Sequence, residues 1–253
     1  MKKYGLIGKS LSHSWSPQWF AQTFARLGIR DAEYRLYEME TVDNLPSWAA
    51  INRMDGFNVT IPFKEAVIPY MDTLDAVARS IGAVNCVECR GGRLIGHNTD
   101  APAFARTLQP LLRPWHTRAL VLGTGGASKA VAYALQSMGI DLTFVSRTPG
   151  RHPAAVSYSE ASRLAATHLL IVNATPVGMS ALAGQSPWPC PQLLTPRHLC
   201  YDLIYNPSPT AFLLQASQSG ATVCDGLPML HAQAELSWQC WSHPAAPAEP
   251  FHQ

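Results

Sequence analysis

An apolar run that ends in a glycine-rich turn constrains the fold of this chain more than any other feature. Residues 119–122 are the continuous apolar run Ala-Leu-Val-Leu, and the turn at residues 123–128 follows directly. Helical spacing then continues to Met138, Gly139 closes the helix, and a second apolar segment occupies residues 142–146. Strand, glycine turn, helix and strand form a parallel βαβ unit, which is the building block of dinucleotide-binding domains.

The glycine turn is suited to binding a pyrophosphate. Glycines allow backbone N–H groups to approach phosphate oxygens closely, and the amino end of the following helix adds a favourable dipole. The spacing departs from G-x-G-x-x-G because Ser128 stands where the third glycine would be. A tight turn without a ligand therefore stays an alternative. The residues expected to bind the cofactor in this turn are Gly123, Thr124, Gly125, Gly126 and Ala127.

The end of the second strand distinguishes NADP from NAD. An acidic residue there would bond the ribose 2′-hydroxyl of NAD, whereas an arginine suits the 2′-phosphate of NADP. The chain has Ser146-Arg147-Thr148 at this place, Arg151 lies just beyond, and no carboxylate occurs between Ser146 and Ser159. The sequence therefore predicts NADP, bound with the help of Ser146, Arg147, Thr148 and Arg151. An arginine at a strand end can also be an ordinary solvated charge.

The segments on both sides of this unit predict further strands and helices. Before it, strands are expected over residues 4–8, 33–38, 54–60, 84–89 and 94–97, and helices over residues 18–27 and 101–112. After it, strands are expected over residues 169–173, 199–204 and 221–224, and a final helix from Gly226 through Trp241. The turn Arg90-Gly91-Gly92-Arg93 joins two of the strands as a hairpin. Pro110 and Pro114 bracket a connector at which the hydrophobic period changes.

Composition excludes several classes of protein. Charged residues make up only 14% of the chain, the formal net charge is +2, and no long basic run occurs, which argues against a nucleic-acid-binding surface. The amino terminus lacks the apolar stretch and the cleavage site of a signal peptide. The most apolar window, residues 164–172, is too short to span a bilayer. We therefore expect a cytoplasmic protein that acts on a small molecule, with neither nucleic acid nor membrane as a partner.

Two of the six cysteines, Cys86 and Cys89, form a C-x-x-C pair. This spacing occurs in redox pairs and in zinc sites, but no second pair follows at a matching spacing. On a strand over residues 84–89, Val84 and Cys86 would point to one face and Val87 and Cys89 to the other. We therefore expect each thiol to act as a small hydrophobe, and we expect no metal site.

Seven motifs, in order along the chain, resemble those of the shikimate dehydrogenase family. Residues 13–17 (HSWSP) resemble its N-terminal H-S-x-S-P, and residues 56–64 (GFNVTIPFK) resemble its G-x-N-V-T-x-P-x-K. The other five follow in the family's order: GAVN at residues 82–85, GHNTD at residues 96–100, NATPVGM at residues 173–179, DLIYNP at residues 202–207 with Thr210, and GLPMLHAQ at residues 226–233.

The resemblance implies an α/β fold of two domains. Residues 1–100 would form a substrate-binding domain, residues 101–225 a Rossmann-type NADP-binding domain, and residues 226–253 a C-terminal helix and tail that return to the substrate domain. The active site would lie between the two domains. The implied reaction is the reversible NADPH-dependent reduction of 3-dehydroshikimate to shikimate, a step of chorismate and aromatic amino acid biosynthesis. A monomer or a homodimer is expected.

The resemblance also implies roles for individual residues. Ser14, Ser16 and Tyr205 would bind the substrate carboxylate, Thr60, Asn85 and Gln233 the ring hydroxyls, and Lys64 and Asp100 the reacting oxygen. Thr175, Leu203 and Gly226 would complete the cofactor site. These roles suit the chemistry, because a polyhydroxylated ring needs several fixed donors and acceptors. Taken singly, Ser16-Pro17 is also a common turn opening, and an asparagine such as Asn85 can simply bond nearby backbone.

The chain departs from the family pattern in three places. Ser146 stands where the family usually has asparagine, and Phe20-Ala21 replaces its usual His-Asn. Only 24 residues separate Thr148 from Asn173, and prolines occupy the first part of this segment. We therefore expect the helix that normally follows the second strand of the cofactor domain to be shortened or missing.

Three alternative functions follow from related scaffolds. An NAD-using quinate/shikimate dehydrogenase is disfavoured by Arg147. A non-catalytic, NADPH-responsive binding protein is disfavoured by the retention of both Lys64 and Asp100. A reductase of folate-type substrates is disfavoured by the two serines and Gln233.

Overall fold

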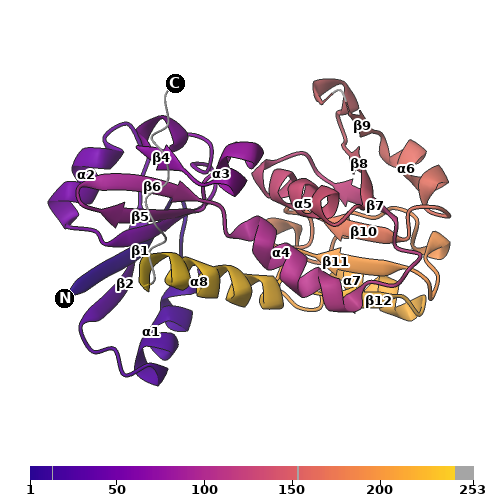
Figure 1. The fold of residues 1–253 in the computed structure, drawn as a ribbon. Coiled ribbons are helices and arrows are strands. Elements are labelled where there is room, and N and C mark those ends of the chain that lie inside the picture. Colours follow the sequence, from indigo (N-terminus) through magenta and orange to yellow (C-terminus); the bar gives the residue numbers. More distant parts are fainter. Residues whose placement is uncertain (13, 153, 243–253) are drawn as a thin grey trace. The chain divides into compact units, whose positions relative to one another are not determined.

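The computed structural model describes residues 1–12, 14–152 and 154–242 (Figure 1). The chain divides into two compact units. The first unit contains Met1–Thr99 and the chain from Gln233 onward, and the second contains Asp100–Ala232. The first division lies next to the predicted boundary at residue 100. The second division falls at Gln233, because the start of the last helix, Leu227–Ala232, belongs to the second unit.

The first unit is built on a mixed six-stranded sheet in the order β2-β1-β3-β5-β6-β4. The strands are β1 (Lys2–Gly8), β2 (Ala32–Glu38), β3 (Gly56–Val59), β4 (Thr73–Leu74), β5 (Cys86–Arg90) and β6 (Arg93–His97). Strands β1, β2 and β3 are parallel, whereas β5 is antiparallel to both β3 and β6. The carboxyl ends of β1, β3 and β6 therefore meet the amino end of β5 at one edge of the sheet, which we call the first edge.

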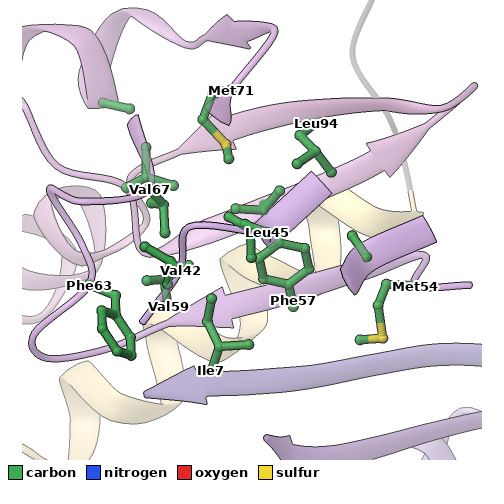
Figure 2. Close-up of a cluster of buried hydrophobic side chains, with 14 of the residues drawn as sticks. Ile7, Val42, Leu45, Met54, Phe57, Val59, Phe63, Val67, Met71 and Leu94 are labelled. Carbon is green, nitrogen blue, oxygen red and sulfur yellow. The ribbon is translucent and has the colours of Figure 1, made fainter. Parts of the chain in front are cut away.

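Helices cover both faces of this sheet. They are α1 (Ser16–Arg26), α2 (Leu45–Asn52), α3 (Ala76–Ile81) and the part of α8 (Leu227–Ser242) from Gln233 onward; Ile68–Tyr70 is a 3-10 turn. On one face Ile7, Phe57 and Val59 pack against Leu45 of α2 (Figure 2). On the other face Tyr4 packs with residues of α1 and α8. Alternation along each strand explains why neighbouring residues join opposite cores.

Trp241 attaches α8 to the first sheet. Its indole N–H donates a hydrogen bond to the Val87 carbonyl at 3.0 Å, and its ring stacks on Tyr4 with the centroids 4.8 Å apart. A Cβ atom at Gly56 would lie 2.4 Å from the Trp241 indole nitrogen, so a side chain at this strand position would collide with the ring. The C-terminal helix therefore returns to the first unit, as predicted.

The C-x-x-C cysteines point to opposite faces of β5. Cys86 is buried with Tyr4 under α8, whereas Cys89 packs against the core on the other side. One detail of the prediction is wrong: Val84 shares the core of Val87 rather than the face of Cys86. Strand β5 begins only at Cys86, so strand alternation does not extend back to Val84.

The second unit is built on an all-parallel six-stranded sheet in the order β12-β11-β10-β7-β8-β9. The strands are β7 (Arg118–Leu122), β8 (Asp141–Val145), β9 (Ala155–Val156), β10 (Leu170–Asn173), β11 (Leu199–Asp202) and β12 (Thr222–Cys224). If β7 is counted as the first strand of this unit, the order read from β9 to β12 is 3-2-1-4-5-6, which is the strand order of dinucleotide-binding sheets. The direction of winding changes between β7 and β10, and ligands of such sheets bind at the carboxyl ends of the strands beside this point.

Helices cover both faces of the second sheet, which explains the unbroken apolar runs in its strands. The helices are α4 (Asp100–Leu108), α5 (Gly126–Ser137), α6 (Tyr158–Leu164) and α7 (Ala211–Gln218); Gln109–Leu111, Pro149–Arg151, Ser180–Leu182 and Pro191–Leu193 are 3-10 turns. On one face Leu120 and Ile171 pack with Phe212 of α7. On the other face, the rings of Phe104 in α4 and Tyr201 in β11 pack edge to face, with their centroids 5.0 Å apart.

The connection between β8 and β9 is short. Parallel strands are usually joined through a helix, but among the described residues from Ser146 to Ala154 the chain forms one 3-10 turn, Pro149–Arg151. The strand that follows has two residues, and α6 then starts with a capping box between Ser157 and Glu160. The expectation that the helix after the second strand is shortened or missing is confirmed for these residues.

A buried carboxyl group joins the strands β10 and β11 at their carboxyl ends. The Asp202 side chain accepts hydrogen bonds from the Asn173 amide at 2.9 Å, the Ile204 backbone N–H at 3.0 Å and the Thr210 hydroxyl at 2.7 Å. Asp202 is fully buried. Burial raises its pKa to about 6, although the three hydrogen bonds favour the charged form. The motif residues Asn173, Asp202 and Thr210 thus form a structural network.

The raised pKa of Asp202 predicts a pH-dependent cost to stability. Because the folded-state pKa lies above the ordinary value of 3.8, the contribution of Asp202 to stability is greatest below that value and is lost as the pH rises through about 6. From about pH 5 to about pH 8 the loss is roughly 1.4 kcal/mol. Asp202→Asn removes the titration, so the variant should gain this amount relative to the wild type over the same range, measured by urea unfolding. A pH-independent difference would contradict the assignment.

Candidate functional site

The glycine turn of the second unit lies at the change of winding direction between β7 and β10. Gly123 has φ 101°, a conformation that favours glycine, and its N–H donates to the Val145 carbonyl at 2.8 Å. A Cβ atom at Gly123 would lie 3.0 Å from the Thr175 methyl carbon and 3.2 Å from the Ala174 carbonyl oxygen. The turn is therefore packed closely against the loop that follows β10.

The next two glycines leave the amino end of α5 open. Gly125 is the N-cap residue and α5 begins at Gly126, so the helix has no capping side chain. A Cβ atom built on either glycine would meet nothing within 4 Å. The first N–H groups of α5 therefore lie beside a glycine surface that a large anionic group can approach, and a pyrophosphate fits this arrangement.

The residues that follow β8 lie at the same edge of the second sheet. The Ser146 hydroxyl accepts a hydrogen bond from the Thr148 N–H at 3.1 Å, which folds the chain tightly there. Arg147 is exposed and makes no ion pair with any described residue. Burial raises the pKa of Tyr158, and the nearby Arg147 guanidinium opposes this rise. The side chain of Arg151 lies outside the described residues.

Thr175, Leu203 and Gly226 also meet at this edge. The Thr175 hydroxyl donates to the Asn173 side chain at 2.7 Å, and the Leu203 N–H donates to the Asn173 carbonyl at 3.0 Å. A Cβ atom at Gly226 would lie 2.1 Å from the Leu203 carbonyl oxygen, so only glycine allows this approach of the two backbones. Tyr205 is half-buried, and burial raises its pKa. The edge thus carries most of the predicted cofactor residues.

The first edge, in the other unit, carries predicted substrate residues. Thr60 follows β3, and its N–H donates to the Ile7 carbonyl at 3.0 Å. Asn85 precedes β5, and its carbonyl accepts from the Val59 N–H at 2.9 Å. The Val84 N–H donates to the Lys64 carbonyl at 2.8 Å, which fixes the backbone of Lys64 next to that of Asn85. The structure therefore brings Thr60, Lys64 and Asn85 to one place on the sheet.

The two serines lie at the start of α1. The Ser16 N–H donates to the Ser14 hydroxyl at 3.3 Å. Burial raises the pKa of Tyr34, and the nearby Ser16 side chain, which can donate a hydrogen bond to the tyrosine oxygen, opposes the rise. The first turn of α1 has no acidic residue, so the positive end of the helix dipole favours a carboxylate there. His13, the first residue of this motif, lies outside the described residues.

Four side chains, three of them buried and one, Tyr34, half-buried, connect the predicted substrate residues. None of the four was itself predicted to belong to the site. Tyr34, Asn58, Thr99 and Ser237 form hydrogen bonds with one another and with Asn85. Asn58 and Thr99 lie inside the family motifs, so the sequence did offer a reason to place them near the site. Ser237 lies four residues after Gln233 and hence on the same face of α8. This spacing could have indicated that Ser237 lies near the site.

Lys64 and Asp100 belong to different units. Lys64 is half-buried in the first unit, whereas Asp100 is buried and is the first residue of α4 in the second. Their joint action at a reacting oxygen stays a prediction. Among the described residues, no group of three histidine, cysteine or acidic side chains is arranged to hold a metal ion. In the same part of the chain, no helix is long and apolar enough to cross a membrane.

Comparison with known proteins shows which family this chain resembles. A family model described as the shikimate dehydrogenase substrate binding domain matches residues 6–87. The shikimate dehydrogenase (NADP(+)) of Thermus thermophilus is 37% identical over 251 residues, covering 96% of this chain and 93% of that protein.

Two solved structures are similar over nearly the whole chain. The Thermus thermophilus shikimate 5-dehydrogenase in complex with NADP(H) and shikimate has a TM-score of 0.85 at 36% identity, and the match covers 96% of this chain and 94% of that one. The quinate dehydrogenase of Corynebacterium glutamicum in complex with NAD has a TM-score of 0.87 at 29% identity, and the match covers 95% and 93%. With 37% identity to a curated relative over nearly its full length, the chain belongs to the shikimate dehydrogenase family.

Proposed function

We propose that this protein catalyses the reversible, NADPH-dependent reduction of 3-dehydroshikimate to shikimate. The observation that carries the proposal is that each sheet gathers a different half of the family's motif residues at one edge. The first edge carries hydroxyl, amide and ammonium groups, and the edge of the second sheet carries a glycine turn and an arginine. A relative that is 36% identical binds NADP(H) and shikimate.

The second unit is the NADP-binding domain in this proposal, and it corresponds to residues 101–225 of the sequence prediction. The open surface of Gly125 and Gly126 at the start of α5 fits the pyrophosphate. Arg147 fits the 2′-phosphate, because a guanidinium makes charge-assisted and often bidentate bonds to phosphate oxygens. When bound, NADPH supplies the hydride for the reaction. Thr175, Leu203 and Gly226, which meet at the same edge of the sheet, complete the cofactor site.

The first unit is the substrate domain, completed by the last helix. Ser14 and Ser16, beside the amino end of α1, bind the substrate carboxylate with Tyr205 as a further donor. Thr60, Asn85 and Gln233 hold the ring hydroxyls. Such a site uses fixed polar groups rather than arginines, and it rejects ligands that leave those groups unpaired.

Lys64 supplies the acid of the reaction. As the carbonyl of 3-dehydroshikimate gains negative charge, the Lys64 ammonium group stabilises that charge and donates a proton to the oxygen. Asp100 accepts a hydrogen bond from the same hydroxyl and orients the lysine. In the reverse direction Lys64 takes the proton back. The hydrogen bond from the Val84 N–H to the Lys64 carbonyl holds the backbone of this loop in place for the proton transfer.

Both partners of the reaction are small water-soluble molecules, so the proposal needs neither nucleic acid nor a membrane. A cytoplasmic monomer or homodimer is the setting we propose. The second candidate is an NAD-dependent quinate dehydrogenase, which the similarity to the Corynebacterium enzyme favours. Arg147 after β8 argues for NADP instead, because it stands where an NAD enzyme needs a carboxylate.

The cofactor assignment predicts a preference for NADP that depends on Arg147. Loss of one charge-assisted contact costs roughly 1.5–3 kcal/mol, or about ten- to a hundredfold. Arg147→Ala should therefore lower kcat/KM for NADP by this factor and leave that for NAD nearly unchanged. Arg118→Ala, at the amino end of β7 and thus at the opposite edge of the sheet, is the matched control and should have no effect. Equal efficiency of the wild type with NAD would reject the assignment.

The proposed acid predicts a loss in the chemical step. Lys64→Ala should lower kcat by about 10²–10⁴-fold, the usual range for one general acid–base group. Asp100→Asn should act in the same direction, and the double variant should be little worse than the poorer single one, because the two residues act as a unit. Lys2→Ala, an exposed lysine at the start of β1, is the control. If Lys64→Ala folds by circular dichroism and keeps its kcat, the lysine is not catalytic.

The assignment of α8 to the substrate domain predicts a selective effect of Gln233. Gln233→Ala should raise KM for shikimate by about tenfold, the effect of one lost hydrogen bond. The KM for NADP should stay within about twofold, because Gln233 belongs to the first unit. Initial rates with one substrate varied at a time separate the two constants. A variant impaired only toward NADP would mean that Gln233 belongs to the cofactor site.

A further inference from the structure

The Ser237 hydroxyl lies at the junction of three hydrogen bonds beneath α8. It donates to the Gln233 carbonyl at 2.8 Å, accepts from the Asn58 amide at 2.8 Å and lies 3.3 Å from the Thr99 hydroxyl. Ser237 is fully buried, and Asn58 and Thr99 are almost so. A buried hydroxyl with this many partners is costly to remove, because each partner loses a bond that water cannot replace.

One arm from Ser237 leads to the start of α1. The Asn58 side-chain oxygen accepts from the Tyr34 hydroxyl at 2.9 Å, and the Ser16 side chain lies near enough to Tyr34 to lower its pKa against the effect of burial. Tyr34 is held rigidly by stacking on Phe20, with the ring centroids 4.1 Å apart. This arm therefore connects α8 with Ser16, a residue that the proposed function places at the substrate carboxylate.

The other arm leads to Asn85. The Asn85 amide donates to the Thr99 hydroxyl at 2.9 Å, and its side-chain oxygen accepts from the Thr99 N–H at 2.7 Å. Two bonds between the same two residues fix both the rotamer of Asn85 and the backbone at Thr99. This arm therefore connects α8 with Asn85, which the proposed function places at a ring hydroxyl.

We propose that Ser237 is a positioning residue, which sets Gln233 relative to Ser16 and Asn85. Gln233 lies one helical turn before Ser237 on the same face of α8, and the Ser237 hydroxyl binds the carbonyl of that very residue. Any shift or rotation of the helix would stretch the bonds to Asn58 and Thr99. The inference rests on the proposed function, because it assumes that these three residues bind one substrate.

The test is the kinetics of Ser237→Ala in the full-length protein. KM for shikimate should be about tenfold higher in the variant, which is the effect of one misplaced hydrogen bond. Its kcat and its KM for NADP should stay within about threefold of the wild-type values. Ser242→Ala is the matched control: Ser242 also donates to the carbonyl four residues earlier on α8, at 2.6 Å. This control should leave KM for shikimate unchanged.

A double-mutant cycle separates positioning from mere packing. If Ser237 acts through Gln233, then Ser237→Ala should change KM for shikimate by less than about twofold in a Gln233→Ala background. If its effect on KM is the same in both backgrounds, the positioning role is wrong. Should Ser237→Ala fail to fold, Thr99→Val removes a partner hydroxyl without changing the side-chain shape, and the same rise in KM is expected.

The outcomes also distinguish the inference from the proposed function. A wild-type protein that turns over shikimate, together with a folded Ser237→Ala variant of normal KM, overturns the inference alone. A wild-type protein without activity on shikimate overturns the proposed function, and the inference with it.

Discussion

Attachment of the C-terminal helix to the first sheet is the interaction on which the substrate half of the molecule depends. The face of that sheet under α8 carries the polar side chain of Asn58 beside Cys86 and Tyr4. A helix that covers this face must bury the apolar side chains and also provide a hydrogen-bond partner for the polar one. Trp241 provides a large apolar contact and a hydrogen bond to β5, and Gly56 provides the space for it. Ser237 then satisfies the polar groups beside it.

The same physical rule builds a site in each unit. Polar groups that cannot stay inside a sheet gather where its strands end, and parallel strands end together. In the second unit this edge combines glycines, which allow backbones to approach closely, with an arginine beyond β8 and a carboxyl network that ties β10 to β11. In the first unit the antiparallel strand β5 brings its amino end, with Asn85, to the edge that holds Thr60. One sheet thus carries glycines and an arginine where its strands end, and the other carries hydroxyl and amide groups there.

Much of this fold could be predicted from local pattern. Continuous apolar runs indicated the central strands, and Gly91-Gly92, with φ of 58° and 79°, indicated the hairpin turn. The helices α2, α3, α6 and α7 were not predicted. Three of them carry recognisable caps, at Asp75, Ser157 and Thr210, so the signal was present. The helix α2 is short, with a proline in its first turn and a weak polar face, and offers little periodicity to detect.

The candidate site was predictable only in part, for a physical reason. Motifs identify residues that lie close in sequence, such as Thr60 and Lys64. The partners of a buried network, however, come from distant segments: Tyr34, Asn58 and Ser237 meet only because β2, β3 and α8 pack together. The sequence around each of these three residues does not indicate which distant residue its side chain will contact. Likewise, the face to which Val84 points depends on where β5 begins, and the alternation of residues in the sequence does not determine that point.

The most direct test of the account is whether the purified protein turns over, rather than merely binds, its two partners. The measurement is the loss of NADPH absorbance after 3-dehydroshikimate is added, with the product identified by chromatography against shikimate. The account predicts steady consumption of NADPH with shikimate formed in equal amount, and the reverse reaction from shikimate and NADP. Binding of both molecules without turnover in either direction would contradict it and would indicate a non-catalytic protein built on this scaffold.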